Sequence, residues 1–185
     1  MSDTGFVDER PAGPRIDPRW GVALVALLAL ATVFWPRATK EPPSEGGFLL
    51  DDGGRPVPIS RELKPVTLVH FWATWCPPCL EELPRLMQFA ESVEDDRFGL
   101  LLVAVRDEAV EAKRFLGSDR YPLLFDPQWE VAHRFSTSKL PETHLLVRGE
   151  VVDSFIAAQD WRRPEIRERV LAHLTPRAPA AAGGG

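Results

Sequence analysis

The chain has 185 residues, of which 44% are hydrophobic and 26% are charged, enough for one globular core with appendages. Its formal net charge of -5 argues against nucleic acid as a partner, because a phosphate backbone is bound by a basic surface. Cys76 and Cys79 are its two cysteines, and both belong to one Cys-Pro-Pro-Cys stretch.

The N-terminal part is distinct from the rest. Residues 1–19 are rich in proline, glycine and charge, and are expected to be disordered. Residues 20–35 carry no charged side chain and would span roughly 24 Å as a helix, a little under the hydrocarbon thickness of a bilayer. Because Trp20 and Trp35 stand at the two ends, this run is predicted to be an uncleaved transmembrane anchor. A cleaved signal peptide, with a small-residue pattern at 29–31, is the alternative.

Three arginines precede this apolar run, and one arginine and one lysine follow it. This weak bias predicts a single-pass protein of the cell inner membrane, with its N-terminus in the cytoplasm and its cysteine-bearing domain in the periplasm. Residues 36–46, rich in proline, are expected to be a linker, and the Ala, Pro and Gly of 176–185 a disordered tail. The folded domain is therefore expected over residues 47–175.

Within that domain, strand and helix patterns alternate, which predicts an α/β fold. A turn of Asp and Gly at 51–54 separates two short runs and indicates a hairpin. The expected strands are 48–50, 57–60, 66–72, 100–105, 123–125, 143–147 and 151–155. The expected helices are 77–93, 110–116, 128–135 and 164–174.

The cysteine pair carries the chemistry. If a strand ends near Trp75 and a helix begins at Pro77, Cys76 lies at the helix N-terminus, where unpaired N–H groups and the macrodipole favour a thiolate. Cys79 would lie on the same helix face and be less exposed. We therefore expect Cys76 to attack a substrate disulfide and Cys79 to resolve the mixed disulfide that results.

Two other uses of the pair are weaker. A structural zinc site takes four ligands and would need two of the four scattered histidines. A purely structural disulfide would close so small a loop that it would constrain the unfolded chain very little. No metal or cofactor is expected.

The segment from Val69 to Cys79, with its Phe-Trp-Ala-Thr-Trp-Cys-Pro-Pro-Cys core, resembles the TlpA/ResA/DsbE group of membrane-anchored thioredoxin-like oxidoreductases. The resemblance covers about residues 46–175 and extends to Leu-Pro-Glu-Thr at 140–143. It implies a thioredoxin-like fold with an added N-terminal β-hairpin. It also implies a reductant of protein disulfides outside the cytoplasm, in many members for cytochrome c maturation.

The resemblance also assigns supporting residues. It makes Pro141 the cis-proline beside the cysteines, which would leave the Leu140 backbone free to pair with a substrate strand. It links Glu82 to tuning of the cysteines, although spacing alone would allow a surface role. From its position beside Cys76, and not from the resemblance, Trp75 is expected to offer substrate a flat apolar platform.

His70 occupies the place where thioredoxins carry a buried acid. A neutral imidazole there could accept the Cys79 proton, or it could be a core histidine satisfied by a backbone carbonyl. The remaining histidines and one tryptophan fall in no motif and receive no role; they are His133, His144, His173 and Trp161.

The expected function is thiol-disulfide exchange with protein disulfides, apocytochrome c among the candidates, and with a membrane dithiol as electron donor. Two alternatives are a thiol-dependent peroxidase and a membrane-tethered copper(I) chaperone, since soft sulfur selects Cu(I). The cysteine spacing is wrong for the peroxidase. Stoichiometric copper without reductase activity would favour the chaperone.

Overall fold

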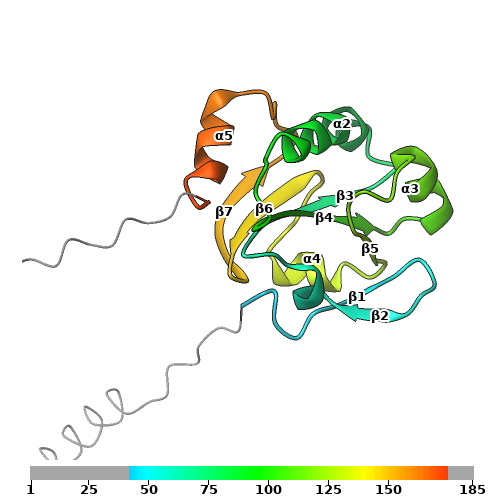
Figure 1. Ribbon diagram of the computed structural model, residues 1–185. Coiled ribbons are helices and arrows are strands. Elements are labelled where there is room, and N and C mark those ends of the chain that lie inside the picture. Colours follow the sequence, from blue (N-terminus) through cyan, green and yellow to red (C-terminus); the bar gives the residue numbers. More distant parts are fainter. Residues whose placement is uncertain (1–41, 175–185) are drawn as a thin grey trace, which may run out of the picture. The chain divides into compact units, whose positions relative to one another are not determined.

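The structure, a computed structural model, describes residues 42–174, which form a seven-stranded sheet with helices on both faces (Figure 1). The strands are β1 (Phe48–Leu50), β2 (Pro56–Pro58), β3 (Val66–Trp72), β4 (Phe98–Val105), β5 (Leu123–Asp126), β6 (Glu142–Val147) and β7 (Glu150–Ile156). The helices are α2 (Pro77–Glu91), α3 (Ala109–Leu116), α4 (Glu130–Arg134) and α5 (Pro164–Leu171), with a short 3-10 helix, η1 (Ile59–Glu62).

The strand order is β2-β1-β5-β4-β3-β6-β7. Strands β3, β4 and β5 are parallel, whereas β6 pairs antiparallel with β3, and β1 antiparallel with β5. Because parallel strands end at the same edge, the loops that follow β3, β4 and β5 gather there. The cysteines follow β3, so this edge positions the site.

Each face of the sheet has an apolar cluster that packs against helices. Every residue of β3 is buried, as expected for a central strand. Leu68 and Trp72 face a core cluster that includes residues of α2, α3 and α5, while Val69 and Phe71 face a second cluster with residues of α4 and η1. His70 shares the side of Leu68 and Trp72, because successive side chains of a strand point to opposite faces. It is therefore directed toward α2.

The first two strands pair antiparallel, with Phe48 opposite Pro58. The Asp51 carboxylate shapes the turn between them, because its Oδ1 accepts hydrogen bonds from the backbone N–H groups of Gly53 and Arg55, each at 2.9 Å. The turn therefore forms where the Asp and Gly residues predicted it.

Several expected elements have other bounds in the structure; among them, α2 ends at Glu91 rather than at 93, and β4 begins at Phe98 rather than at 100. The second strand stops at Pro58, because the chain turns into η1 and buries Ile59. Helix α4 begins at Glu130 rather than at 128. Trp129 adopts a left-handed φ of 62°, which is incompatible with a right-handed α-helix. Helix α5 ends at Leu171 rather than at 174.

No helix within residues 42–174 is both long and apolar enough to cross a membrane. The expected disordered segment 1–19, the anchor at 20–35 and the tail at 176–185 lie outside the described residues.

Candidate active site

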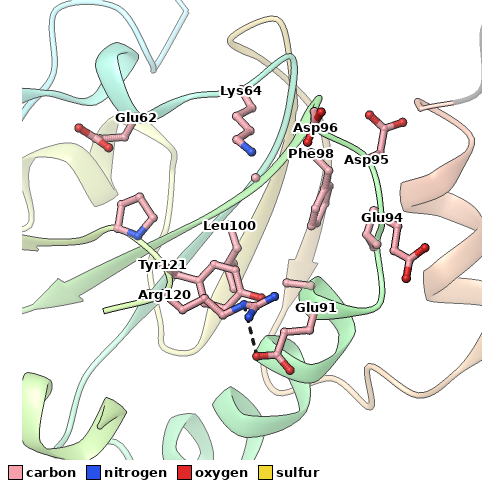
Figure 2. A pocket seen from close by; sticks show the side chains of 14 residues that line it. Glu62, Lys64, Glu91, Glu94, Asp95, Asp96, Phe98, Leu100, Arg120 and Tyr121 are labelled. Atoms are coloured by element: carbon pink, nitrogen blue, oxygen red, sulfur yellow. Dashed lines mark ion pairs between the residues drawn. The ribbon is translucent and has the colours of Figure 1, made fainter. Parts of the chain in front are cut away.

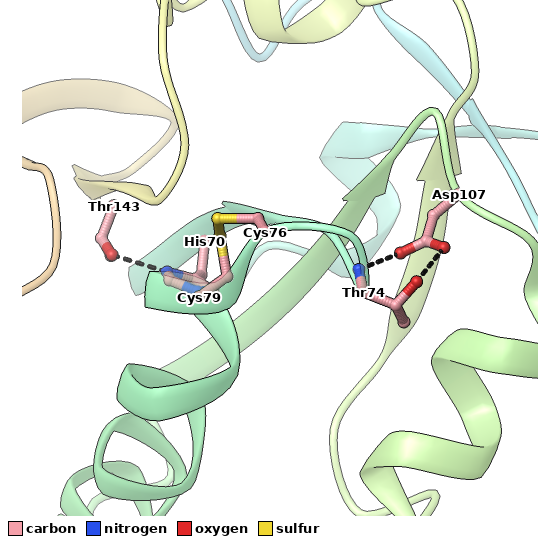
Figure 3. The surroundings of a disulfide bond; sticks show 6 residues. All are labelled: His70, Thr74, Cys76, Cys79, Asp107 and Thr143. Atoms are coloured by element: carbon pink, nitrogen blue, oxygen red, sulfur yellow. Dashed lines mark hydrogen bonds between the residues drawn. A yellow bond between two sulfur atoms is a disulfide. The ribbon is translucent and has the colours of Figure 1, made fainter.

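Cys76 and Cys79 form a disulfide at the start of α2, with their Cα atoms 5.3 Å apart (Figure 3). Cys76 is the N-cap residue of the helix, as the sequence predicted. Cys79 is fully buried, whereas Cys76 keeps 6% of its surface exposed. Cys76 is therefore the more accessible of the two cysteines.

The two prolines between the cysteines change the expected electrostatics. Pro77 and Pro78 occupy the first positions of α2 and carry no N–H. The next N–H groups, those of Cys79 and Leu80, both donate to the Cys76 carbonyl, at 2.9 and 3.3 Å. Few free backbone donors are left at this helix end, so a Cys76 thiolate receives few direct N–H hydrogen bonds here and is stabilised through the aligned peptide dipoles of the helix.

His70 is completely buried among the residues that surround the disulfide (Figure 3). Its Nδ1 lies 2.8 Å from the Thr143 hydroxyl oxygen, while its Nε2 has no hydrogen-bond partner. Burial lowers the pKa of His70 to about 3, so the ring is neutral at physiological pH. By contrast, buried His144 has partners on both ring nitrogens, the hydroxyls of Thr137 and Ser154. The partner of His70 is thus a side-chain hydroxyl and not the expected backbone carbonyl.

A carboxylate fixes the loop just before the cysteines. Asp107 accepts a hydrogen bond from the Thr74 backbone N–H at 2.5 Å and another from the Thr74 hydroxyl at 2.6 Å (Figure 3). The next residue, Trp75, is 54% exposed, and its indole N–H donates to the Arg106 carbonyl at 2.9 Å. Two successive residues after β4 therefore hold the loop, and the Trp75 ring stays exposed to solvent.

Glu82 is buried one turn further along α2, with only 2% of its surface exposed. Its Oε1 accepts a hydrogen bond from the indole N–H of Trp161 at 2.5 Å, whereas its Oε2 has no partner. Burial raises the pKa of Glu82 to about 7, against the opposing effect of the Trp161 hydrogen bond. Glu82 is therefore a buried acid and not a solvated surface residue.

The Leu140–Pro141 peptide bond is cis, as expected. It directly precedes β6, in which Glu142 pairs with Phe71 and Thr143 with His70. If this register is extended by one residue, Pro141 lies beside the end of β3, the strand that leads to the cysteines.

A cavity of about 710 Å³ lies at the opposite edge of the sheet (Figure 2). It is lined by the first residues of β4, the end of α2 and several acidic side chains, and Arg120 pairs there with Glu91 at 3.4 Å. Neither cysteine lines this cavity, which lies at the edge of the sheet away from the disulfide. Residues 42–174 contain no group of three His, Cys, Asp or Glu side chains that could hold a metal ion.

The family model of Redoxin matches residues 36–168. The chain belongs to the Redoxin family. The thiol-disulfide oxidoreductase ResA of Bacillus subtilis is 28% identical to it over 148 residues, which cover 75% of this chain and 83% of that protein. The expected kinship with the TlpA/ResA/DsbE group is confirmed.

Solved structures share the fold. A secreted Mycobacterium tuberculosis disulfide oxidoreductase superposes with a TM-score of 0.58 at 20% identity, over 71% of this chain and 98% of that one. The exposed lipoprotein thioredoxin Etrx1 of Streptococcus pneumoniae gives 0.53 at 21% identity, over 66% and 97%. The thioredoxin-like fold expected from the sequence is thus confirmed.

Three residues of the site had no role in the sequence interpretation. Trp161 is distant along the chain and belongs to no motif, so nothing in the sequence pairs it with Glu82. Thr143 was quoted in a motif, but only the β3–β6 register places it against His70. Asp107 follows β4 closely, and its position after a buried parallel strand is the one signal that could have indicated it.

Proposed function

We propose that this chain reduces protein disulfides with its Cys76–Cys79 dithiol, from a membrane-anchored position outside the cytoplasm. The chain is a thiol-disulfide oxidoreductase, as its family membership and its relatives indicate. The observation that carries the proposal is the disulfide at the N-terminus of α2, with Cys76 slightly exposed and Cys79 fully buried.

The reaction follows from that asymmetry. In the reduced protein, the Cys76 thiolate attacks one sulfur of the substrate disulfide, and the other substrate sulfur leaves as a thiolate. Cys79 then attacks the Cys76 sulfur, which re-forms the disulfide and releases the second substrate thiol. The substrate gains two electrons and two protons, and the protein loses them. A dithiol donor must reduce the protein again.

His70 is proposed as a positioning residue for the second step. When its Nδ1–H donates to the Thr143 hydroxyl, its Nε2 lone pair is free to accept a hydrogen bond from the Cys79 thiol. Because the pKa of His70 is about 3, the ring does not retain a proton at neutral pH. His70 therefore orients the thiol, and the proton leaves with the departing substrate sulfur.

The role of His70 predicts a kinetic split. His70→Leu removes the acceptor and should slow release of the mixed disulfide much more than its formation. His70→Asn keeps an amide acceptor and should slow release less. Rapid mixing of reduced protein with a chromogenic mixed disulfide separates the two steps. Equal slowing of both steps by both variants would mean that His70 has only a packing role.

The membrane location and the substrate are proposed from the sequence. The uncharged run at 20–35, bounded by tryptophans, supports an inner-membrane anchor with the domain in the periplasm. Pro-Glu-Thr at 141–143 resembles the DsbE-type members and supports apocytochrome c as a substrate, with a membrane dithiol as donor. Fractionation and protease protection of the tagged full chain test the location.

The decisive test of the activity is a trapping experiment. Cys79→Ser leaves Cys76 able to attack but removes the resolving thiol, so it should accumulate covalent adducts with a disulfide-bonded protein such as insulin. Cys76→Ser should form none. The midpoint potential then gives the direction of electron flow: a value well below about -200 mV supports a reductant, and one near about -120 mV an oxidase. Absence of adducts with Cys79→Ser would refute the activity.

A further inference from the structure

A second cavity, of about 390 Å³, opens beside the cysteines. Its lining residues are Trp75, Arg106, Trp129, His133 and Ser138. Trp75 follows β3, Arg106 follows β4 and Trp129 follows β5, so the cavity lies at the carboxyl ends of the three parallel strands. Open α/β sheets bind ligands at this edge. We call these five residues the tryptophan pocket.

The walls of the tryptophan pocket are aromatic and fixed in orientation. The Trp75 indole is held by its hydrogen bond to the Arg106 carbonyl, yet more than half of its surface stays exposed. On the other side, the Trp129 and His133 rings are 5.8 Å apart and tilted by 32°. Trp129 is half-buried and packs against the core. An exposed, preoriented tryptophan such as Trp75 buries large apolar area on binding at a small entropic cost. The pocket therefore suits a flat apolar side chain.

The backbone holds this shape before any ligand binds. Arg106 and Trp129 both adopt left-handed conformations, with φ of 48° and 62°, which non-glycine residues rarely do. The N–H groups of both residues donate to the Asp126 carbonyl, each at 3.3 Å, and the Asp126 carboxylate in turn accepts hydrogen bonds from the start of α4. Backbone strain at two walls of one cavity is a feature of binding sites.

The pocket also has a charge preference. The exposed Arg106 guanidinium forms no ion pair with any residue between 42 and 174, and no carboxylate is among the lining residues. The chain as a whole has a net charge of -5, so this cation stands beside the cysteines of an otherwise acidic protein. An unpaired guanidinium at the rim of an aromatic pocket recognises a carboxylate.

We propose that the tryptophan pocket binds an aromatic side chain of the substrate polypeptide, next to an acidic residue that pairs with Arg106, while the substrate cysteine meets Cys76. This inference rests on the proposed function and adds its substrate preference. Because Trp75 is adjacent to Cys76 in the chain, a residue bound in the pocket lies within a few positions of the reacting cysteine.

Synthetic peptide disulfides test the preference with the full-length protein. One peptide carries Phe-Glu beside its disulfide cysteine, a second carries Phe-Lys and a third carries Ala-Glu, and bis(2-hydroxyethyl) disulfide serves as a small neutral substrate. We expect kcat/KM for the Phe-Glu peptide to exceed that of each other peptide by about tenfold. Arg106→Glu should reverse the order of Phe-Glu and Phe-Lys, and Trp129→Phe should keep the fold while it weakens the preference for Phe over Ala.

Arg148→Glu is the matched control. Arg148 is also an exposed arginine with a left-handed φ, of 53°, but it lies in the β6–β7 turn at the opposite edge of the sheet. It should leave all peptide ratios unchanged. Equal rates for the three peptides, or the same ratios in Arg106→Glu and Arg148→Glu, would overturn the pocket assignment. Failure to reduce even bis(2-hydroxyethyl) disulfide would instead overturn the proposed function.

Discussion

Glu82 gives the sharpest thermodynamic prediction, because it is an acid buried beside an indole with no cation to balance it. Burial raises its pKa from the ordinary value of 4.5 to about 7 in the folded protein. Below pH 4.5 the carboxyl is protonated in both the folded and the unfolded chain, so it contributes no pH dependence. Between pH 4.5 and about 7 the unfolded chain loses the proton while the folded chain keeps it, and the folded state is progressively destabilised.

The size of this effect follows from the shift. At about 1.36 kcal/mol for each pKa unit, the loss amounts to about 3 kcal/mol and is complete above pH 7. Glu82→Gln keeps an oxygen that can accept the Trp161 hydrogen bond but cannot ionise. The free energy of unfolding of the variant, relative to the wild type, should therefore rise by about 3 kcal/mol from pH 4.5 to pH 8.

Urea denaturation of the oxidised protein at a series of pH values measures this difference, since the disulfide prevents titration of the thiols. His70 and His144, whose pKa values burial lowers, contribute a pH dependence of opposite sign, which cancels when the variant is subtracted from the wild type. Glu81→Gln, at the exposed neighbouring position, is the matched control and should follow the wild type. A constant difference between Glu82→Gln and the wild type across this range would refute the reasoning.

Three further predictions concern single contacts of the site. Pro78→Ala adds one N–H to the start of α2 and should lower the pKa of Cys76 by several tenths of a unit, measured from thiolate absorbance against pH; an unchanged or higher pKa would contradict the helix-end argument. Thr143→Val leaves the Nδ1 of His70 without a partner and should cost about 1–3 kcal/mol in urea unfolding, with Thr143→Ser restoring it. Asp107→Asn weakens two hydrogen bonds to the loop before the disulfide and should speed hydrogen exchange there while the strands stay protected; unchanged exchange would remove its anchoring role.

The order of strands and helices could be predicted because each has its own local signal. The predominantly apolar residues of β3, on both of its faces, indicated a strand buried on both sides, and Pro77 after Cys76 indicated the start of α2. The end of the second strand could not be predicted, because Ile59 is buried by contacts with residues that are distant along the chain, in the core cluster on the α4 side of the sheet. Local periodicity contains no information about such tertiary contacts.

The candidate site divides in the same way. The cysteines were evident from their spacing, and their unequal exposure followed from the helix that they begin. The interpretation of Cys76 as surrounded by free N–H donors needed correction, because two successive prolines remove those donors. The contacts of Glu82 with Trp161 and of His70 with Thr143 join distant parts of the chain, so strand register and helix packing had to be known before either pair could be recognised.

The most direct test of the account is the alkylation rate of each cysteine in the fully reduced protein at neutral pH, followed by mass spectrometry of the cysteine-containing peptides. The account predicts that Cys76 reacts first and faster than a free cysteine, because the helix end stabilises its thiolate, and that buried Cys79 stays protected. Faster modification of Cys79, or rates for both thiols no higher than that of a free cysteine, would contradict it.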